Sequence, residues 1–133
     1  MADEKRIGPI MTNKLILLVD DCLPNLKLTQ FLLTQGGFVV GTAESAEQAL
    51  MALAERVPDM ILMDIQLPGM DGLELTRHLR RDASLQGVPI VAFTASAIKG
   101  DEEIARAAGC DGYITKPIDT RTFVSVVGKF VNS

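Results

Sequence analysis

The sequence is poor in the residues on which several functional classes depend. Cysteine occurs only at Cys22 and Cys110, which are far apart and form no CxxC pair, so neither a disulfide framework nor a zinc site is indicated. The motif GxxxxGK[ST] does not occur, which excludes a Walker-type nucleotidase. The single histidine, His78, falls on a predicted helix surface, so the chain shows no phosphohistidine module.

The chain also lacks long apolar runs and an excess of positive charge. No run approaches the roughly 20 residues of a membrane-spanning helix, and residues 1–13 contain no apolar stretch typical of a secretory signal. Lys and Arg number 13 against 17 Asp and Glu, a net charge of -4. Because non-specific affinity for nucleic acid comes from basic residues, we expect no nucleic-acid partner. The lack of long apolar runs leads us to expect no membrane partner and a cytoplasmic location.

Length and composition fit a single folded domain. The chain has 133 residues, of which 47% are hydrophobic and 23% charged, as is ordinary for a globular protein that buries its own core. We expect residues 1–13 to form a flexible N-terminal tail and residues 14–131 to form the domain. The acidity is better explained by a cation site.

Apolar runs that are typical of buried strands alternate with segments of helical period. Long runs indicate central parallel strands, and the weaker runs at 38–41 and 112–115 indicate strands nearer the edges. The candidate strands cover residues 15–19, 38–41, 60–63, 88–93 and 112–115. Helical spacing of apolar residues occurs between them, as in 46–53, and after them, in 123–130. This order predicts an α/β fold, a doubly wound five-stranded parallel sheet of (βα)5 type.

Residues able to carry chemistry follow four of these strands. Asp20 and Asp21 follow the first strand and Asp64 the third, whereas Thr94 and Lys116 follow the fourth and fifth. The carboxyl ends of neighbouring parallel strands meet at one crevice of the sheet. We therefore expect three carboxylates, one hydroxyl and one ammonium to lie together.

Adjacent carboxylates favour a bound cation. Asp20 and Asp21 repel each other unless a cation lies between them, and Mg²⁺ fits best because it prefers oxygen ligands and keeps several waters. Asp64 can then act as both ligand and nucleophile, since an aspartate that attacks phosphorus forms an acyl phosphate. Lys116 and Thr94 are suited to stabilise charge on the phosphoryl oxygens.

Each of these residues also has a plain structural interpretation. Paired aspartates after a strand are often a helix cap, and Asp64 alone is consistent with entry into a turn. Thr94 is an ordinary β-branched strand residue, and Lys116 fits a solvated charge. Their joint occurrence at matching strand ends favours the functional interpretation.

The motifs that contain these residues resemble those of one family. Val19-Asp20-Asp21, the segment from Leu62 to Gly72, Phe93-Thr94-Ala95 and the segment from Tyr113 to Pro117 have the family's order and spacing. The sequence from Lys14 to Val131 is similar to response-regulator receiver domains of the chemotaxis Y-protein type. In finer detail it resembles the cell-division receiver K of the alpha-proteobacteria and receivers of hybrid kinases. The resemblance implies the flavodoxin-like strand order 2-1-3-4-5.

The resemblance also implies roles at the acidic positions. Asp64 matches the phosphoacceptor of the family, and Asp21 and Asp20 match its direct and water-mediated magnesium ligands. Gln66 matches the residue whose backbone carbonyl completes the metal shell. Mg²⁺ is therefore the expected cofactor.

The remaining matches imply a switch. Lys116 matches the family's lysine, and Pro117 matches the proline that is reached through a cis bond. Thr94 and Tyr113 match the switch pair, in which the hydroxyl moves toward the phosphoryl group and the aromatic ring turns inward. The surface around the fourth helix, fifth strand and fifth helix is then reshaped for a downstream protein partner.

The expected function is that of a phosphorelay signalling domain. A histidine kinase or phosphotransfer protein supplies the phosphoryl group to Asp64, and the domain, a monomer or weak homodimer, promotes its own phosphorylation and dephosphorylation without being a turnover enzyme. A haloacid-dehalogenase-type phosphatase needs a second acid two residues beyond its nucleophile, where this chain has Gln66. The alternative is an unphosphorylated pseudo-receiver that binds proteins, although such domains usually lose an acidic ligand, the acceptor or the lysine.

Overall fold

The structure is a computed structural model, and it describes residues 14–65, 67, 71–94, 101–116 and 118–131. The tail expected at residues 1–13 lies outside the described residues.

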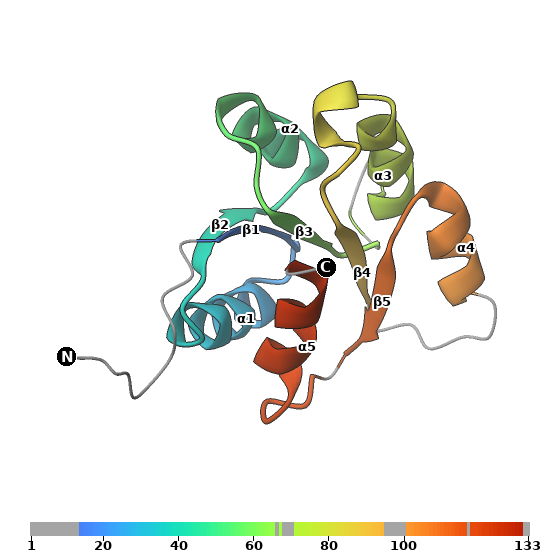
Figure 1. Cartoon of the computed structure of the whole chain (residues 1–133). Helices are drawn as coiled ribbons and strands as arrows, with labels where there is room; N and C mark the ends of the chain where they lie inside the picture. The colour runs from blue at the N-terminus through green and yellow to red at the C-terminus, as the bar shows by residue number, and fades with distance from the viewer. Residues whose placement is uncertain (1–13, 66, 68–70, 95–100, 117, 132–133) are drawn as a thin grey trace.

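Strands and helices alternate along the described chain, as the sequence predicts (Figure 1). The elements are β1 (Leu15–Val19), α1 (Leu23–Gln35), β2 (Val39–Ala43), α2 (Ala46–Glu55), β3 (Met60–Met63), α3 (Gly72–Arg80), the short 3-10 helix η1 (Ala83–Leu85), β4 (Ile90–Thr94), α4 (Asp101–Ala108), β5 (Gly112–Thr115) and α5 (Phe123–Val131). None of the described helices has the length and apolar character needed to cross a membrane.

The five strands form one parallel sheet in the predicted order, β2-β1-β3-β4-β5. The register pairs Val19 of β1 with Met63 of β3, and Met63 with Ala92 of β4. Asp20 and Asp64 therefore leave adjacent strands at the same level. The chain reverses its direction of strand addition at β1, which creates the crevice at the carboxyl ends that doubly wound sheets use for ligands.

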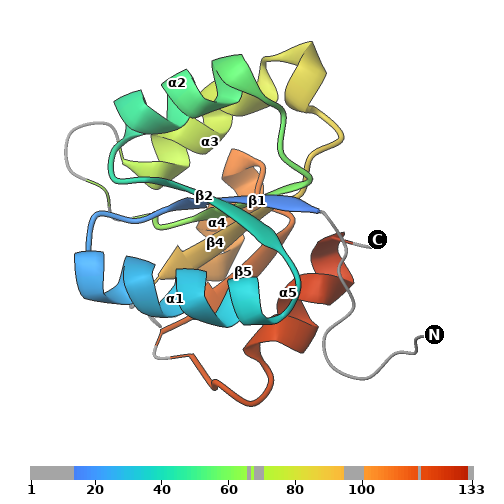
Figure 2. The same ribbon diagram turned by 90° about the vertical axis from the view of Figure 1, so that its left-hand side faces the viewer.

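Helices cover both faces of the sheet. Figure 2 shows α1 and α5 on one face, with α2 and α3 on the other, where α4 also packs. Because strand side chains alternate between faces, Ile16 and Leu18 join the apolar cluster beneath α1 and α5, whereas Leu17 and Val19 join the cluster beneath α2, α3 and α4. Burial on both faces explains the continuous apolar runs of the central strands.

Two strands, β2 and β4, both begin and end later than the sequence predicts, and β4 ends at Thr94 and not at Phe93. β4 begins at Ile90 and not at Val88, because the carbonyl oxygen of Val88 accepts a hydrogen bond from the guanidinium of Arg80, at 2.9 Å, and Pro89 has no N–H. β2 begins one residue later than predicted, because the N–H of Phe38 donates to the carbonyl of Leu33 and so closes α1. At its other end, β2 extends to Ala43. A side-chain hydrogen bond and a helix-end hydrogen bond thus set where β4 and β2 begin.

The helix boundaries follow local capping signals. Ser45 accepts a hydrogen bond from the backbone N–H of Gln48 at 3.2 Å, and Asp71 accepts one from the backbone N–H of Glu74 at 2.8 Å, so these side chains cap the starts of α2 and α3. Gly109, with a φ of 117°, ends α4 in a conformation that favours glycine. The caps at Ser45 and Asp71 lie in loops at the carboxyl ends of β2 and β3, the edge of the sheet where the crevice is, whereas Gly109 lies in the loop that leads to the amino end of β5.

Candidate functional site

The turn from β1 into α1 gives the two adjacent aspartates different environments. Asp20 is completely buried, whereas Asp21 is exposed. One carboxylate oxygen of Asp20 accepts a hydrogen bond from the backbone N–H of Cys22 at 2.9 Å, which fixes its orientation. The N-cap residue of α1 is Cys22, so neither aspartate has the capping position that the plain structural interpretation assigns to the pair.

Asp64 follows β3 and is held from both sides. Its N–H donates to the carbonyl of Val19 at 2.8 Å, which continues the ladder between β1 and β3, and its side chain is 7% exposed. The first residue of α3, Gly72, packs directly on this backbone, because a Cβ atom at that position would overlap the carbonyl oxygen of Asp64. The absence of a side chain at Gly72 thus allows α3 to approach Asp64.

The three carboxylates form one acidic cluster. Ligand atoms of Asp20, Asp21 and Asp64 all lie within 4.8 Å of one another, with the first and third side chains buried and the second open to solvent. A donor set made only of oxygens suits a hard divalent cation such as Mg²⁺, which retains waters on its exposed side. The residues present therefore fit the metal that the sequence predicts.

Lys116 places its ammonium group against the acidic cluster. Nζ lies 2.8 Å from Oδ2 of Asp20 and 3.4 Å from Oδ2 of Asp64, and the N–H of Lys116 donates to the carbonyl of Thr94 at 2.7 Å. Burial favours the neutral amine, but the hydrogen bond to Asp20 and the charges of Asp64 and Asp20 outweigh it and raise the pKa of Lys116. The crevice therefore contains a permanent positive charge at neutral pH.

Thr94 and Tyr113 lie on neighbouring strands beside the crevice. Thr94 ends β4 and is fully buried, and Tyr113 of β5 is half-buried and paired in register with Ala92. Alternation along the strands puts both residues on the face covered by α2, α3 and α4, where Tyr113 packs against the apolar cluster. The two side chains predicted to act as a pair thus share one face of the sheet.

Two predicted site residues, Gln66 and Pro117, lie outside the described residues. Phe93 and Gly72 also contribute to the site, although no role was predicted for either residue and both occur within the family motifs. A glycine next to an aspartate at the start of a helix is the available signal for Gly72. The ring centroid of Phe93 lies 4.8 Å from Nζ of Lys116. The sequence does not indicate this contact, because it depends on the side of the sheet on which each side chain lies.

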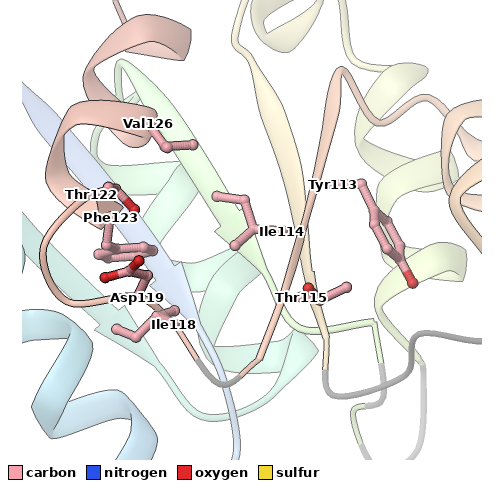
Figure 3. A pocket seen from close by; sticks show the side chains of 8 residues that line it. All are labelled: Tyr113, Ile114, Thr115, Ile118, Asp119, Thr122, Phe123 and Val126. Carbon is pink, nitrogen blue, oxygen red and sulfur yellow. The ribbon is translucent and has the colours of Figure 1, made fainter.

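Two hollows adjoin this region on the side of α5. A small one of about 90 Å³ is lined by Asn25, Leu28, Thr29, Phe93, Lys116 and Ile118. A larger one of about 320 Å³ lies between β5 and the start of α5, and Figure 3 shows Ile114 pointing toward α5 whereas Tyr113 points to the opposite side of β5. The crevice and the α5 face are therefore close neighbours.

Comparison with known proteins gives the family. The model of the response regulator receiver domain matches residues 16–128. The polar-differentiation response regulator DivK of Brucella ovis is 41% identical over 118 residues, which cover 89% of this chain and 96% of that protein. The chain belongs to the response regulator receiver domain family of two-component systems.

Solved structures agree with this assignment. The receiver domain of a sensor histidine kinase from Pseudomonas aeruginosa, with a magnesium ion coordinated in its active-site cleft, is 32% identical and covers 92% of this chain and 100% of its own, with a TM-score of 0.83. A CheY-like receiver domain protein from Methanospirillum hungatei is 28% identical, with a TM-score of 0.82, over 91% of this chain and 95% of its own. The predicted receiver fold is confirmed.

Proposed function

We propose that this receiver domain accepts a phosphoryl group on the carboxylate of Asp64, in the presence of Mg²⁺, and thereby switches a protein-binding surface. The observation that carries the proposal is the clustering of Asp20, Asp21 and Asp64 within 4.8 Å, with the ammonium of Lys116 in contact with two of them. This combination offers a cation site, a nucleophile and a fixed positive charge in one crevice.

The metal would be held by the acidic cluster. Asp21 and Asp64 are the proposed direct side-chain ligands, Asp20 is the proposed ligand through a water, and the backbone carbonyl of Gln66 is proposed to complete the shell. A bound Mg²⁺ supplies positive charge for the oxygens of the transferring phosphoryl group. The magnesium in the related Pseudomonas aeruginosa receiver supports this assignment.

The transfer requires few functional groups from the protein. An oxygen of Asp64 forms a bond to phosphorus as the P–N bond of a phosphohistidine donor breaks, and the imidazole nitrogen leaves with the electron pair. Lys116, already 3.4 Å from that carboxylate, is the proposed ligand for a phosphoryl oxygen, and the hydroxyl of Thr94 is the proposed second one. In this proposal the domain promotes its own phosphorylation and dephosphorylation without being a turnover enzyme.

Thr94 and Tyr113 are the proposed switch pair. A phosphoryl group adds about -1.5 to -2 charges and three strong acceptors, which is enough to bias two conformations that differ by a few kcal/mol. When the hydroxyl of Thr94 turns toward these acceptors, the ring of Tyr113 can move inward on the same face of the sheet. The proposed downstream surface is formed by α4, β5 and α5, where the hollow of about 320 Å³ is found.

We place the upstream phosphodonor protein over α1. The helix starts directly after the acidic pair, and its outer side exposes Leu23, Leu28 and Phe31. Leu28 lines the same small hollow as Lys116, so a protein that delivers phosphate to the crevice would also cover this apolar side. The proposed occupant is therefore the histidine kinase or phosphotransfer protein, because its phosphohistidine has to reach the crevice.

The cysteines support the proposed location. Cys22 and Cys110 are both unpaired, as is usual in a reducing compartment. We propose a cytoplasmic monomer or weak homodimer whose partners are proteins. The pseudo-receiver alternative is less well supported, because the acidic ligands, the acceptor and the lysine are all present.

The acceptor is tested by labelling with a small phosphodonor in Mg²⁺, read by intact-protein mass spectrometry. The wild type and Asp71→Asn should be labelled and Asp64→Asn should not, since the carboxylate of Asp71 caps α3 and lies outside the cluster. Undiminished labelling of Asp64→Asn would move the acceptor elsewhere. A wild type that neither accepts phosphate nor responds to Mg²⁺ would favour the pseudo-receiver.

The docking surface is tested by comparing protein and small-molecule donors. Phe31→Gln on α1 should slow transfer from a cognate phosphotransfer protein and leave labelling by the small donor unchanged. Met51→Gln on α2 is the matched control, because Met51 is equally apolar and 68% exposed but lies on the opposite face of the sheet. If the phosphotransfer protein transfers phosphate to both variants at the same rate, α1 is not the docking surface of the upstream partner.

A further inference from the structure

The ring of Phe93 lies against the ammonium group of Lys116. Phe93 is 1% exposed on β4, one residue before Thr94, and its ring centroid is 4.8 Å from Nζ of Lys116. Phe123, at the start of α5, stacks on the same ring with centroids 5.8 Å apart and an interplanar angle of 29°. The ring is therefore held by the core on one side and faces a charge in the crevice on the other.

The topology explains why these residues meet. Phe93 belongs to the cluster beneath α1 and α5, and Lys116 lies two residues beyond Ile114, which packs against the same cluster. Side chains alternate between the faces of a strand, so Lys116 leaves β5 on the side where the ring of Phe93 is found. Phe93 and Lys116 also line the same small hollow.

A ring face suits this position better than another polar group would. The electron-rich face attracts a cation, and the attraction is stronger in a desolvated site such as that of Lys116, whose side chain is 11% exposed. The ring carries no net charge and no lone pair for a metal. It therefore holds the ammonium without competing for Mg²⁺ or for phosphoryl oxygens.

We propose that Phe93 is a positioning residue for Lys116, and that Phe123 keeps the ring of Phe93 in the orientation required. The inference rests on the proposed function, in which Lys116 binds a phosphoryl oxygen. A bound cation or phosphoryl group would change the contacts of Lys116 with Asp20 and Asp64. Neither can bind to the ring of Phe93, so the contact of Lys116 with the ring would remain. Phe93 thus keeps the ammonium of Lys116 at the crevice while Asp20 and Asp64 interact with the metal or the phosphoryl group.

The test replaces Phe93 by phenylalanines with one, two and three ring fluorines, introduced site-specifically in the full chain. Each fluorine weakens the negative potential of the ring face with little change in volume. The rate of phosphoryl transfer to Asp64 from a small donor in Mg²⁺ should fall stepwise, by about three- to tenfold over the series. The same series at Phe38 is the control, because Phe38 belongs to the same buried cluster but precedes β2, at the opposite end of the sheet.

A spectroscopic measurement separates positioning from packing. The CεH₂ protons of Lys116 should be shifted upfield by the ring current in the wild type, and this shift should disappear when cyclohexylalanine, which fills the same space, replaces Phe93. Because the measurement needs no phosphorylation, it decides the inference even if no donor labels the protein. An unshifted wild-type resonance would overturn the role of the ring.

The outcomes also distinguish this inference from the function on which it rests. Transfer rates that stay level across the fluorinated series, in a protein that is labelled at Asp64, would overturn the role of Phe93 and leave the proposed function intact. Labelling that persists in Asp64→Asn would overturn the proposed function. A stepwise fall at Phe93 with no change at Phe38 would support both.

Discussion

Lys116 and Asp20 form an ion pair at 2.8 Å although 96 positions separate them in the chain. The pair lies where the ends of β1 and β5 approach the same crevice, and both side chains are almost completely removed from solvent. Asp20 and Asp64 are also the carboxylates that a metal ion would use. The ammonium of Lys116 and a divalent cation would therefore compete for the same two carboxylates.

This competition predicts that Lys116→Met binds Mg²⁺ more tightly than the wild type. Removal of one positive charge a few ångströms from the site should raise the affinity by at least about tenfold, because at an effective dielectric constant near 20 the repulsion between a unit charge and a divalent cation at this range exceeds the roughly 1.4 kcal/mol of a tenfold change. Calorimetric titration with Mg²⁺ measures the effect. Lys129→Met, which removes an exposed lysine of α5, should leave the affinity unchanged. Weaker binding by Lys116→Met would show that the ammonium supports the metal site and does not compete with it.

The contact between α3 and Asp64 predicts that Gly72→Ala damages the site as well as the fold. The new methyl group would overlap the backbone of Asp64 and Ile65, and overpacking of this kind typically costs about 1–3 kcal/mol. The displaced carboxylate should also bind Mg²⁺ less well and accept phosphate more slowly. Urea unfolding and metal titration of the same samples give both effects.

A second glycine provides the control for this substitution. Gly128 lies in α5, where an added Cβ atom meets nothing within 4 Å. Gly128→Ala should therefore stabilise the protein by about 0.5–1 kcal/mol, because alanine loses less conformational freedom in a helix. Its Mg²⁺ affinity should match that of the wild type. Wild-type stability in Gly72→Ala would contradict the close approach of α3 to Asp64.

The sequence predicts the convergence of the site but not its internal contacts. Asp20, Asp64 and Lys116 come together because parallel strands end at one edge of the sheet, a rule that needs only strand positions. The sequence could not distinguish buried Asp20 from exposed Asp21, because their difference depends on the turn that Cys22 closes. The roles assigned to these residues stay predictions.

The contacts that escaped prediction are those between side chains from distant segments. The start of β4 was predicted two residues too early because nothing local shows that Arg80 of α3 binds the carbonyl of Val88. The approach of Phe93 to Lys116 likewise depends on the order of two strands and on the face from which each side chain leaves. Local pattern specifies elements, whereas such contacts require the assembled fold.

Arg80 connects the end of α3 to three other segments, and this predicts that Arg80→Lys destabilises the protein. Its guanidinium donates to the carboxylate of Asp111 at 2.6 Å and to backbone carbonyls of Leu85, Val88 and Gly109 at 2.9 to 3.0 Å. An ammonium group cannot reproduce this planar fork, so several carbonyls lose their partner. We expect a loss of about 1.5–3 kcal/mol in the free energy of unfolding, measured in urea.

An exposed arginine serves as the control for Arg80. Arg121 is 86% exposed and pairs only locally with Asp119, at 3.2 Å in the described contacts. Exposed pairs of this kind contribute little, so Arg121→Lys should change stability by less than about 0.5 kcal/mol. Equal effects of the two substitutions would mean that the fork at Arg80 adds nothing to the fold.

The two cysteines predict a difference in chemical reactivity and in the response of stability to pH. Cys110 is buried, whereas Cys22 is exposed. Burial raises the pKa of the Cys110 thiol, and the hydrogen bond with Thr76 and nearby positive charges offset this only in part. A thiol reagent should therefore modify Cys22 rapidly in the native protein, and it should modify Cys110 at a comparable rate only after unfolding.

The raised pKa of Cys110 also predicts a loss of stability in alkali. The folded protein favours the protonated thiol, so this contribution is fully present below the unfolded pKa, about 8.5, and is lost as pH rises through the higher folded pKa. In Cys110→Ala the unfolding free energy should decline less steeply above pH 8.5 than in the wild type. Lys116, whose pKa is also raised, contributes equally to both proteins and cancels in the comparison. A wild-type slope in Cys110→Ala would show that the buried thiol has no part in the pH dependence.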